Sequence, residues 1–190
     1  MKGKHTSLNF FFIFISTFLL LFSSTKASDI IWQDLSKGDR IILIRHSIAP
    51  GGGDPVGFNL QDCKTQRNLS KEGIDQSKRI GEIFKKKNIP IDQVLSSEWC
   101  RCKDTAHFAF QNFKTFSALN STFSAPYNKN EDKQIKDLKM FINQWNSNKK
   151  NLVLITHYSI ITAVTDAVPS SGEIVVTDKN FRVIGTIRTD

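Results

Sequence analysis

Hydrophobic and polar positions divide the chain into an apolar start, several short apolar runs, and longer stretches in which apolar residues recur at helical spacing. The runs at residues 39–44, 94–96 and 152–156 are typical of strands buried on both faces of a sheet. Residues 70–87 and 132–146 have the spacing of amphipathic helices. This alternation of strands and helices predicts βαβ units and therefore a parallel sheet.

The remaining segments complete an α/β pattern. We expect a short amphipathic segment over 30–36, helices over 101–110 and 159–167, a short strand over 114–116, and a closing hairpin of strands 173–177 and 181–187. Residues 50–66 are rich in glycine and proline and predict an irregular loop, which is either functional or a tolerated surface insertion. The predicted fold is a three-layer α/β/α sandwich with a mostly parallel central sheet.

The apolar start has the features of a secretory signal. Two lysines precede an apolar run over residues 8–22, which is shorter than the ~20 residues that a spanning helix needs, and small side chains lead up to Ala27. We expect residues 1–27 to be removed as a signal peptide, which leaves residues 28–190 as one domain. The alternative is an uncleaved anchor. The predicted localisation is periplasmic or secreted, with no integral membrane contact after cleavage.

The charge of the chain favours anionic ligands. The formal net charge is +8, and removing the three lysines of the predicted signal lowers it to +5. Much of this excess is lysine on predicted helix faces, such as Lys85 to Lys87, where charge is usually solvated. Binding of nucleic acid is therefore not implied.

Three cysteines, Cys63, Cys100 and Cys102, predict one disulfide in an exported protein. Cys100 and Cys102 are too close in sequence to be the natural pair, so we expect Cys63 to join one of them, and we favour Cys100. Either bridge would tie the glycine-rich loop to the region around Arg101. The sequence contains neither a CxxC pair nor an HExxH helix, so we expect no metal site.

Arginine and histidine stand directly after two of the predicted strands. Arg45 and His46 follow the first strand, and His157 follows the strand over 152–156. Ligands of open α/β sheets bind beyond the carboxyl ends of the strands. Guanidinium groups suit phosphate, one histidine can attack phosphorus, and a second can stabilise charge or pass protons. These residues predict phosphoryl chemistry without a metal.

Four sequence blocks carry a family resemblance. They are LIRHSIAP at 43–50, RNLSKEG at 67–73, SSEWCRCKDTA at 96–106 and LITHYS at 154–159. In this order and spacing they resemble branch 1 of the histidine phosphatase superfamily, also called the phosphoglycerate mutase-like family, along nearly all of the predicted domain. The resemblance implies a phosphoglycerate mutase-like fold and an enzyme without a cofactor.

The resemblance also implies roles for individual residues. His46 would become phosphorylated, while Arg45, Arg101 and His157 would form the rest of the phosphate pocket. Two guanidiniums would neutralise the phosphoryl oxygens during transfer, and water would then attack the phosphohistidine. Ser96 and Ser97 could contact phosphate, but we expect them to cap the helix that follows.

The chain also departs from the family pattern. Ser47 stands where many members have glycine, and Asn120 lies in the loop where the family usually has its proton-donating glutamate. We expect both residues to be candidates for substrate binding. An amide cannot protonate a leaving alkoxide, and a missing general acid costs on the order of 10² to 10⁴ in rate. Three acids are equal alternatives for this role: Asp54, Glu98 and Glu173.

We therefore expect an exported phosphatase, monomeric or dimeric, that hydrolyses a phosphate ester or anhydride through phosphorylated His46. A substrate with a good leaving group, such as an acyl phosphate, would need little acid catalysis. Mutase activity is not expected, because a mutase must pass protons both ways. The alternative is a pseudophosphatase that binds a phosphorylated small molecule or an envelope glycan or lipid without turnover, and Asn120 supports this alternative.

Overall fold

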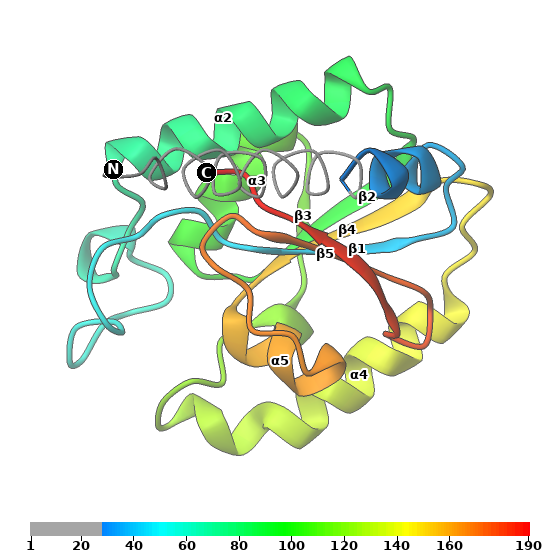
Figure 1. Ribbon diagram of the computed structural model, residues 1–190. Helices are drawn as coiled ribbons and strands as arrows, with labels where there is room; N and C mark the ends of the chain where they lie inside the picture. The colour runs from blue at the N-terminus through cyan, green and yellow to red at the C-terminus, as the bar shows by residue number, and fades with distance from the viewer. Residues whose placement is uncertain (1–27) are drawn as a thin grey trace, which may run out of the picture.

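A six-stranded sheet forms the centre of the computed structural model, which describes residues 28–190 (Figure 1). The strands are β1 (Ile41–Arg45), β2 (Ile91–Ser96), β3 (Lys114–Thr115), β4 (Asn151–Thr156), β5 (Ile174–Thr177) and β6 (Val183–Ile187). The helices are residues 28–35, α2 (Lys71–Lys86), α3 (Cys100–Phe110), α4 (Glu131–Gln144) and α5 (Tyr158–Thr165). The predicted signal peptide, residues 1–27, lies outside the described residues. No helix within residues 28–190 is long and apolar enough to cross a membrane.

The strand order is β3-β2-β4-β1-β5-β6. The first four of these strands pair in parallel, whereas β5 runs antiparallel to β1 and forms the closing hairpin with β6. The predictions of a mostly parallel sheet, a central first strand and a closing hairpin are therefore confirmed. Because Arg45 is paired with Thr156, the residues that follow the two strands, His46 and His157, leave the sheet side by side.

Side chains of the central strands alternate between two cores. Ile42 and Ile44 pack with the helix over 28–35, α2 and α3, and Figure 1 shows these helices on one side of the sheet. Ile41 and Leu43 point to the other side and pack with α4 and α5. All four side chains are fully buried, and each contributes ~1.5–3 kcal/mol of hydrophobic stabilisation. The continuous apolar run is needed because both faces are covered, which confirms the three-layer prediction.

The helices begin and end close to the positions that their sequence signals indicate. Ser70 caps α2, because its Oγ accepts a hydrogen bond from the backbone N–H of Gly73 at 3.1 Å. Lysines occupy the last turn of α2, and Asn88 follows with a positive φ of 50°. The N-cap of α3 is Trp99, whose side chain makes no cap hydrogen bond, so the prediction that Ser96 or Ser97 is the cap is wrong. Ser97 lies two residues before the cap, and its Oγ accepts from the backbone N–H of Trp99 at 3.3 Å.

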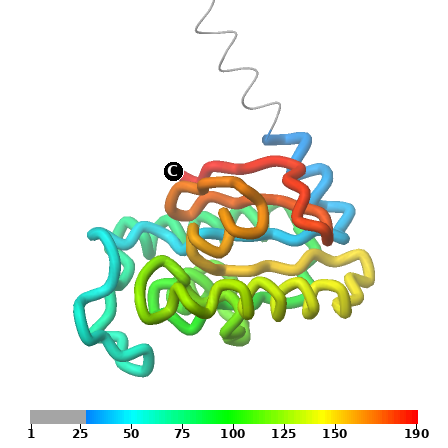
Figure 2. The backbone as a smooth tube through the Cα atoms, turned by 90° about the horizontal axis from the view of Figure 1, so that it is seen from below, coloured from blue at the N-terminus to red at the C-terminus, as the bar shows by residue number. Residues whose placement is uncertain are grey.

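The glycine-rich loop follows β1 and extends from the body of the molecule beyond the end of the sheet (Figure 2). Gly51 and Gly53 have φ values of 93° and 101°, a region that favours glycine because it has no Cβ. The expected disulfide is present: Cys63 in this loop is bonded to Cys100 at the start of α3, with 5.6 Å between the two Cα atoms. The bridge therefore ties the loop to the helix that carries Arg101.

Candidate active site

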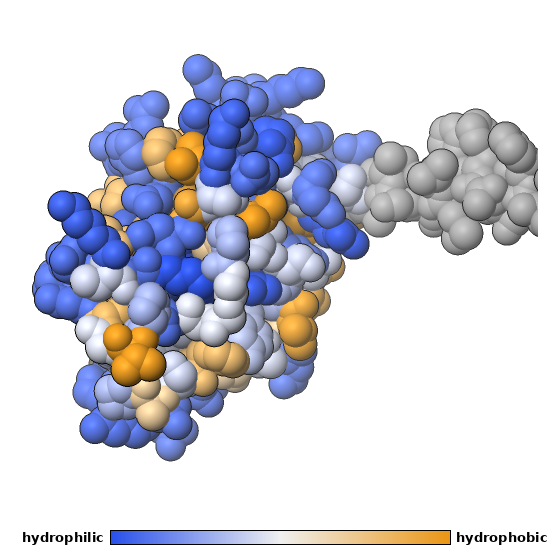
Figure 3. Space-filling model, turned by 90° about the vertical axis from the view of Figure 1, so that its left-hand side faces the viewer, coloured by the Kyte–Doolittle hydropathy of each residue, from blue (hydrophilic) through white to orange (hydrophobic). Residues whose placement is uncertain are grey.

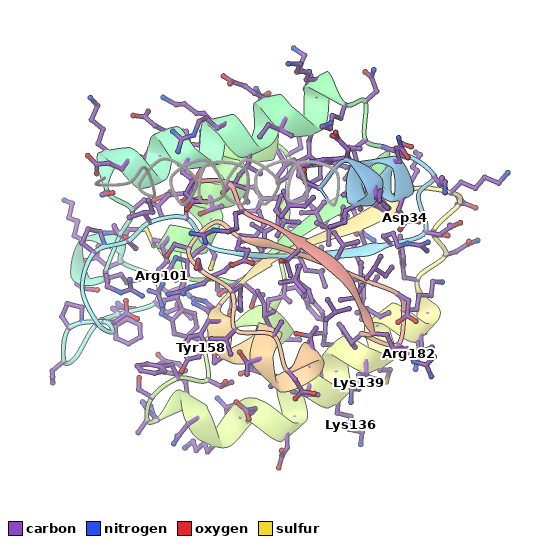
Figure 4. All side chains as sticks on the ribbon, viewed as in Figure 1. Asp34, Arg101, Lys136, Lys139, Tyr158 and Arg182 are labelled. Atoms are coloured by element: carbon purple, nitrogen blue, oxygen red, sulfur yellow. A yellow bond between two sulfur atoms is a disulfide. The ribbon has the colours of Figure 1, made fainter. Side chains whose placement is uncertain are left out.

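A pocket of about 160 Å³ opens where the carboxyl ends of β1 and β4 meet the glycine-rich loop. Arg45, His46, Arg101 and His157, the residues that the strand ends and the family resemblance single out, all line it. Figure 4 shows Arg101 at this end of the sheet, whereas Asp34 lies at the opposite end. On the face of the molecule shown in Figure 3, strongly hydrophilic residues lie among residues of intermediate hydropathy. The fold thus brings all four predicted residues to one place.

His46 is positioned by backbone and carbonyl groups. Its N–H donates to the carbonyl of Thr156 at 2.9 Å, which fixes it against the neighbouring strand. Its ring Nδ1 lies 2.8 Å from the carbonyl oxygen of Ser47, which can only accept, so Nδ1 carries the proton. Burial, and then the charge of Arg101, hold the pKa of His46 well below its ordinary value. The ring is therefore neutral at pH 7, with a lone pair on Nε2.

His157 lies beside His46, with 5.4 Å between the ring centroids. Its Nδ1 is 3.3 Å from Nη2 of Arg101, which can only donate, so Nδ1 is the acceptor. The Nε2 proton is then directed at Ser97 Oγ, 2.9 Å away. Burial, followed by the charge of Arg101, lowers the pKa of His157 well below its ordinary value. This neutral ring holds the Arg101 guanidinium in the pocket.

Three guanidiniums converge on the pocket, because Arg67 joins Arg45 and Arg101. Burial lowers the pKa of Arg45 and of Arg67, and the nearby charge of Arg101 lowers both further. The Nε atoms of all three side chains are buried and have no hydrogen-bond partner. Buried donors without partners are costly, and a tetrahedral oxyanion would satisfy them. The arrangement is therefore chemically suited to a phosphoryl group.

Asp54 partly balances these charges from the glycine-rich loop. Its carboxylate accepts from Nη1 of Arg101 at 2.8 and 3.1 Å, from the indole N–H of Trp99 at 3.0 Å, and from the backbone N–H of Arg67 at 3.0 Å. Both charged groups of the Asp54–Arg101 pair are buried. With three guanidiniums and this carboxylate, the residues that line the pocket carry a formal charge of +2. A phosphoryl dianion matches that charge.

Ser47 and Asn120 do not line this pocket, contrary to the expectation that they bind substrate. Ser47 is fully buried; its backbone N–H donates to Thr105 Oγ1, and its Oγ accepts from Ser77 Oγ. The amide oxygen of Asn120 accepts from Ser97 Oγ at 3.2 Å and from the backbone N–H of Glu98 at 2.9 Å. The side chains of Ser47 and Asn120 therefore bond to other protein groups and do not line the pocket.

Of the three candidate acids, Asp54 alone lines the pocket. Glu98 accepts a hydrogen bond from Nδ2 of Asn120 at 2.6 Å, on the far side of Ser97 from the ligand space. Glu173 accepts from the backbone N–H of Ser170 at 2.8 Å and lines a different cavity. Both glutamates are therefore held away from a bound phosphoryl group.

Arg67 is the main residue of the site that sequence reasoning missed. Arg67 is the first residue of the block RNLSKEG, one of the four blocks that carry the family resemblance, and this could have identified it as a candidate site residue. Its Nη1 donates to the carbonyl of Ala49 across the base of the glycine-rich loop. The aromatic lining of the pocket, which includes Phe58 and Tyr127, was also missed, because these residues belong to no recognisable sequence motif.

The third cysteine is also near the site but is enclosed. Cys102 is fully buried, with its Sγ 3.4 Å from Nε2 of His157 and 3.6 Å from the carbonyl of Thr156. Burial raises the pKa of its thiol to about 12. The thiol is therefore protonated at neutral pH and acts as packing against the histidine. Among residues 28–190, no group of three or more His, Cys, Asp or Glu side chains is placed to hold a metal ion.

Comparison with known proteins places the fold. No family model matches the sequence, and no curated protein is similar to it in sequence. Solved structures are similar in fold. The protein histidine phosphatase SixA complexed with tungstate has 15% identity and a TM-score of 0.53, and the match covers 78% of this chain and 96% of that one. A phosphoglycerate mutase from Thermus thermophilus has 19% identity and a TM-score of 0.54, with 80% and 99% covered.

A third structure, a candidate alpha-ribazole-5'-P phosphatase from Escherichia coli K-12, has 14% identity and a TM-score of 0.53, with 77% of this chain and 94% of that chain covered. These proteins are phosphatases and mutases with the histidine phosphatase fold. At these identities the likeness establishes the fold of the present chain, and it confirms the phosphoglycerate mutase-like architecture that the four sequence blocks implied.

Proposed function

We propose that this chain is an exported phosphatase of the histidine phosphatase superfamily, which hydrolyses a phosphate ester or anhydride through a phosphohistidine at His46. One observation carries the proposal: three guanidiniums with unpartnered Nε–H groups surround a neutral histidine at the end of a central strand. A cationic pocket alone would bind an anion. The neutral imidazole beside it adds a nucleophile for the phosphorus of that anion.

His46 starts the reaction from its Nε2 atom. The hydrogen bond from Nδ1 to the Ser47 carbonyl keeps the proton on the far nitrogen and fixes the ring. The lowered pKa keeps the imidazole neutral, and the lone pair of Nε2 free, at neutral pH. As Nε2 bonds to phosphorus, positive charge develops on the imidazole, and the Ser47 carbonyl oxygen stabilises it. Water then attacks phosphorus, and the bond to Nε2 breaks.

The arginines stabilise the phosphoryl group while it moves between the leaving group and His46. Three guanidiniums in a buried site act at low effective dielectric, where such stabilisation is worth far more than in water. Arg101 is held between Asp54 and His157, so its geometry is fixed before substrate arrives. Removal of one donor of this kind costs ~10²–10³ in kcat.

Two further observations support the proposal. The similar structure of SixA is complexed with tungstate, a tetrahedral oxyanion like phosphate. The Cys63–Cys100 disulfide is compatible with an oxidising compartment, as expected of an exported protein. We infer that the domain acts in the periplasm or outside the cell, on a phosphorylated small molecule or on an envelope glycan or lipid.

A binding protein without turnover is the second candidate function. The acidic side chain of the pocket, Asp54, is already bonded to Arg101 and Trp99, and no other carboxylate within residues 28–190 lines it. A substrate with a poor leaving group would then bind without reacting. The two candidate functions make the same prediction for phosphate affinity and differ in whether His46 becomes phosphorylated.

The decisive experiment uses acetyl phosphate, whose leaving group needs no acid. The full chain is incubated with ³²P-labelled acetyl phosphate and quenched in alkali, and label on His46 is measured by mass spectrometry and by its loss in acid. We expect labelling and release of phosphate by the native chain and by His107→Asn, a matched change at an exposed histidine outside the pocket. His46→Asn should not be labelled. Label that persists in His46→Asn would refute the phosphohistidine, and phosphate binding without any label would favour the binding protein.

A further inference from the structure

Aromatic side chains form one wall of the pocket. Phe58 of the glycine-rich loop, Trp99 before α3 and Tyr127 of the short helix η3 (Tyr127–Asn130) contact one another, with ring centroids 4.9 to 5.8 Å apart. Trp99 also packs edge-on against His157, at 5.4 Å. The three rings come from separate segments of the chain, and each of them lines the pocket. Through Trp99, the three rings are therefore in contact with His157.

A second aromatic pair lines the pocket from another direction. Tyr158 begins α5, and its ring centroid lies 5.7 Å from the guanidinium carbon of Arg45. Figure 4 shows Tyr158 at the same end of the sheet as Arg101. Phe123 contacts Tyr158, with 5.7 Å between the ring centroids, and is 56% exposed to solvent. The exposed ring of Phe123 adds apolar surface to the lining of the pocket, against which an aromatic ligand would pack.

The lack of a free proton donor in the pocket also limits which leaving groups can depart, and this argument does not depend on the aromatic rings. In the part of the chain that the structure describes, Asp54 is the acidic side chain that lines the pocket, and its oxygens already accept from Arg101, Trp99 and the backbone of Arg67. The two histidines are neutral, with their protons directed at Ser47 and Ser97. The site therefore offers a departing oxygen no carboxylic acid proton.

We propose, resting on the function proposed above, that the substrates are aryl phosphates, in which the phosphoryl group is carried by a phenolic oxygen and the ring packs against the aromatic side chains. A phenol such as that of tyrosine has a pKa of about 10, whereas water has a pKa of about 15.7, so a phenolate leaves with far less need for a proton than an alkoxide-type oxygen. The aromatic lining and the missing acid both favour the same class of substrate.

The reaction is balanced without a further reactant. The Nε2 lone pair of His46 forms the bond to phosphorus while the bond from phosphorus to the phenolic oxygen breaks, and its electron pair stays on that oxygen. The oxygen of water then bonds to phosphorus, and the electron pair of the N–P bond returns to Nε2. The phenolate takes up one proton of the water, which gives a phenol and hydrogen phosphate.

The test compares phenyl compounds with small aliphatic compounds that carry the same phosphorus group. Binding of phenylphosphonate and methylphosphonate to the full chain is measured by calorimetry, and turnover of phenyl, ethyl and acetyl phosphate by phosphate release. We expect phenylphosphonate to bind about tenfold more tightly than methylphosphonate. We expect kcat/KM for phenyl phosphate to exceed that for ethyl phosphate by about 10²-fold or more.

The variant Phe123→Leu separates the ring contact from the leaving group. Its side chain is exposed, so the fold should tolerate the change. We expect the ratio of phenylphosphonate to methylphosphonate affinity to fall about three- to tenfold. Phe108→Leu is the matched control, because Phe108 lies on α3 against Lys78, away from the pocket, and that ratio should stay unchanged.

The outcomes distinguish this inference from the proposed function. Equal affinities for the two phosphonates, or an affinity ratio that is indifferent to Phe123→Leu, would overturn the aryl specificity even if acetyl phosphate labels His46. Failure of acetyl phosphate to label or to turn over would overturn the proposed phosphatase. The phosphonate affinities would then still decide whether the pocket selects aromatic ligands.

Discussion

Replacing Asp54 with Asn tests whether the pocket is held together against its own charge. Asp54 and Arg101 form an ion pair whose side chains are 9% and 3% exposed, and the pair lies among two more guanidiniums. Removing one partner of such a buried pair leaves an uncompensated charge and costs ~3–5 kcal/mol of stability. The amide also replaces one of the two acceptor oxygens with an NH2 group, which then faces the N–H of Arg67 or of Trp99 and a guanidinium N–H of Arg101. We expect the free energy of unfolding to fall by about 3 kcal/mol or more.

The chain offers a matched control for this change. Asp34 and Arg40 form a similar ion pair with two hydrogen bonds, at 2.5 and 2.9 Å, but their side chains are 20% and 27% exposed at the opposite end of the sheet. Solvent screens such a pair, so Asp34→Asn should cost only about 0–1 kcal/mol. The two variants therefore differ in burial and in neighbouring charge rather than in chemistry.

The assay is urea unfolding of the full chain, native and variant, with and without inorganic phosphate. Phosphate should stabilise Asp54→Asn more than the native chain, because the anion replaces the missing negative charge beside Arg101. Two results would refute the reasoning. One is a stability loss in Asp54→Asn no larger than that in Asp34→Asn, and the other is a phosphate effect that is equal in the variant and in the native chain.

Three further predictions follow from the same geometry. Because the pKa values of His46 and His157 are both lowered, the unfolded chain binds more protons below about pH 6.5, and each histidine then lowers the free energy of unfolding by about 1.4 kcal/mol per pH unit as the pH falls. His46→Asn should roughly halve the combined slope in unfolding measured between pH 7 and 5, and an unchanged slope would contradict this. The disulfide closes a loop with a sequence separation of 37, so replacing Cys63 and Cys100 with Ser should cost about 4 kcal/mol, and an unchanged urea midpoint would contradict this. A Cβ on Gly73 would lie 2.1 Å from the carbonyl oxygen of Ile48, so Gly73→Ala should lower kcat/KM through the displaced loop, whereas Gly52→Ala, with open space around it, should not.

The sequence predicts the fold well because each element carries its own signal. The strand over 39–44 is apolar at every position between Arg40 and Arg45, and such a run is required only where helices cover both faces of a sheet. Ser70 caps the helix that its side chain predicts. The strand ends also place the two predicted site histidines, because neighbouring parallel strands bring His46 and His157 to the same edge of the sheet.

The rest of the site depends on contacts that no local pattern encodes. Arg67 reaches the pocket because the glycine-rich loop folds back, with Asp54 bonded to its backbone and Ala49 to its side chain. Ser47 follows the predicted nucleophile directly, yet the backbone turns its side chain into the core against Ser77. A position next to the predicted nucleophile in the sequence therefore does not predict that the side chain lines the pocket.

The net positive charge of the pocket explains why an ion pair and a disulfide hold the glycine-rich loop in place. Three guanidiniums repel one another, and two neutral histidines offer them no compensation. One carboxylate and one disulfide hold the glycine-rich loop against α3, and the carboxylate belongs to that loop while the bridge ends next to Arg101. The loop thus supplies the counter-charge Asp54 and one end of the disulfide, and the proposed phosphoryl ligand would add negative charge to a pocket lining of formal charge +2. Because the loop also supplies part of the pocket lining, these two supports favour the functional interpretation of the loop over a tolerated surface insertion.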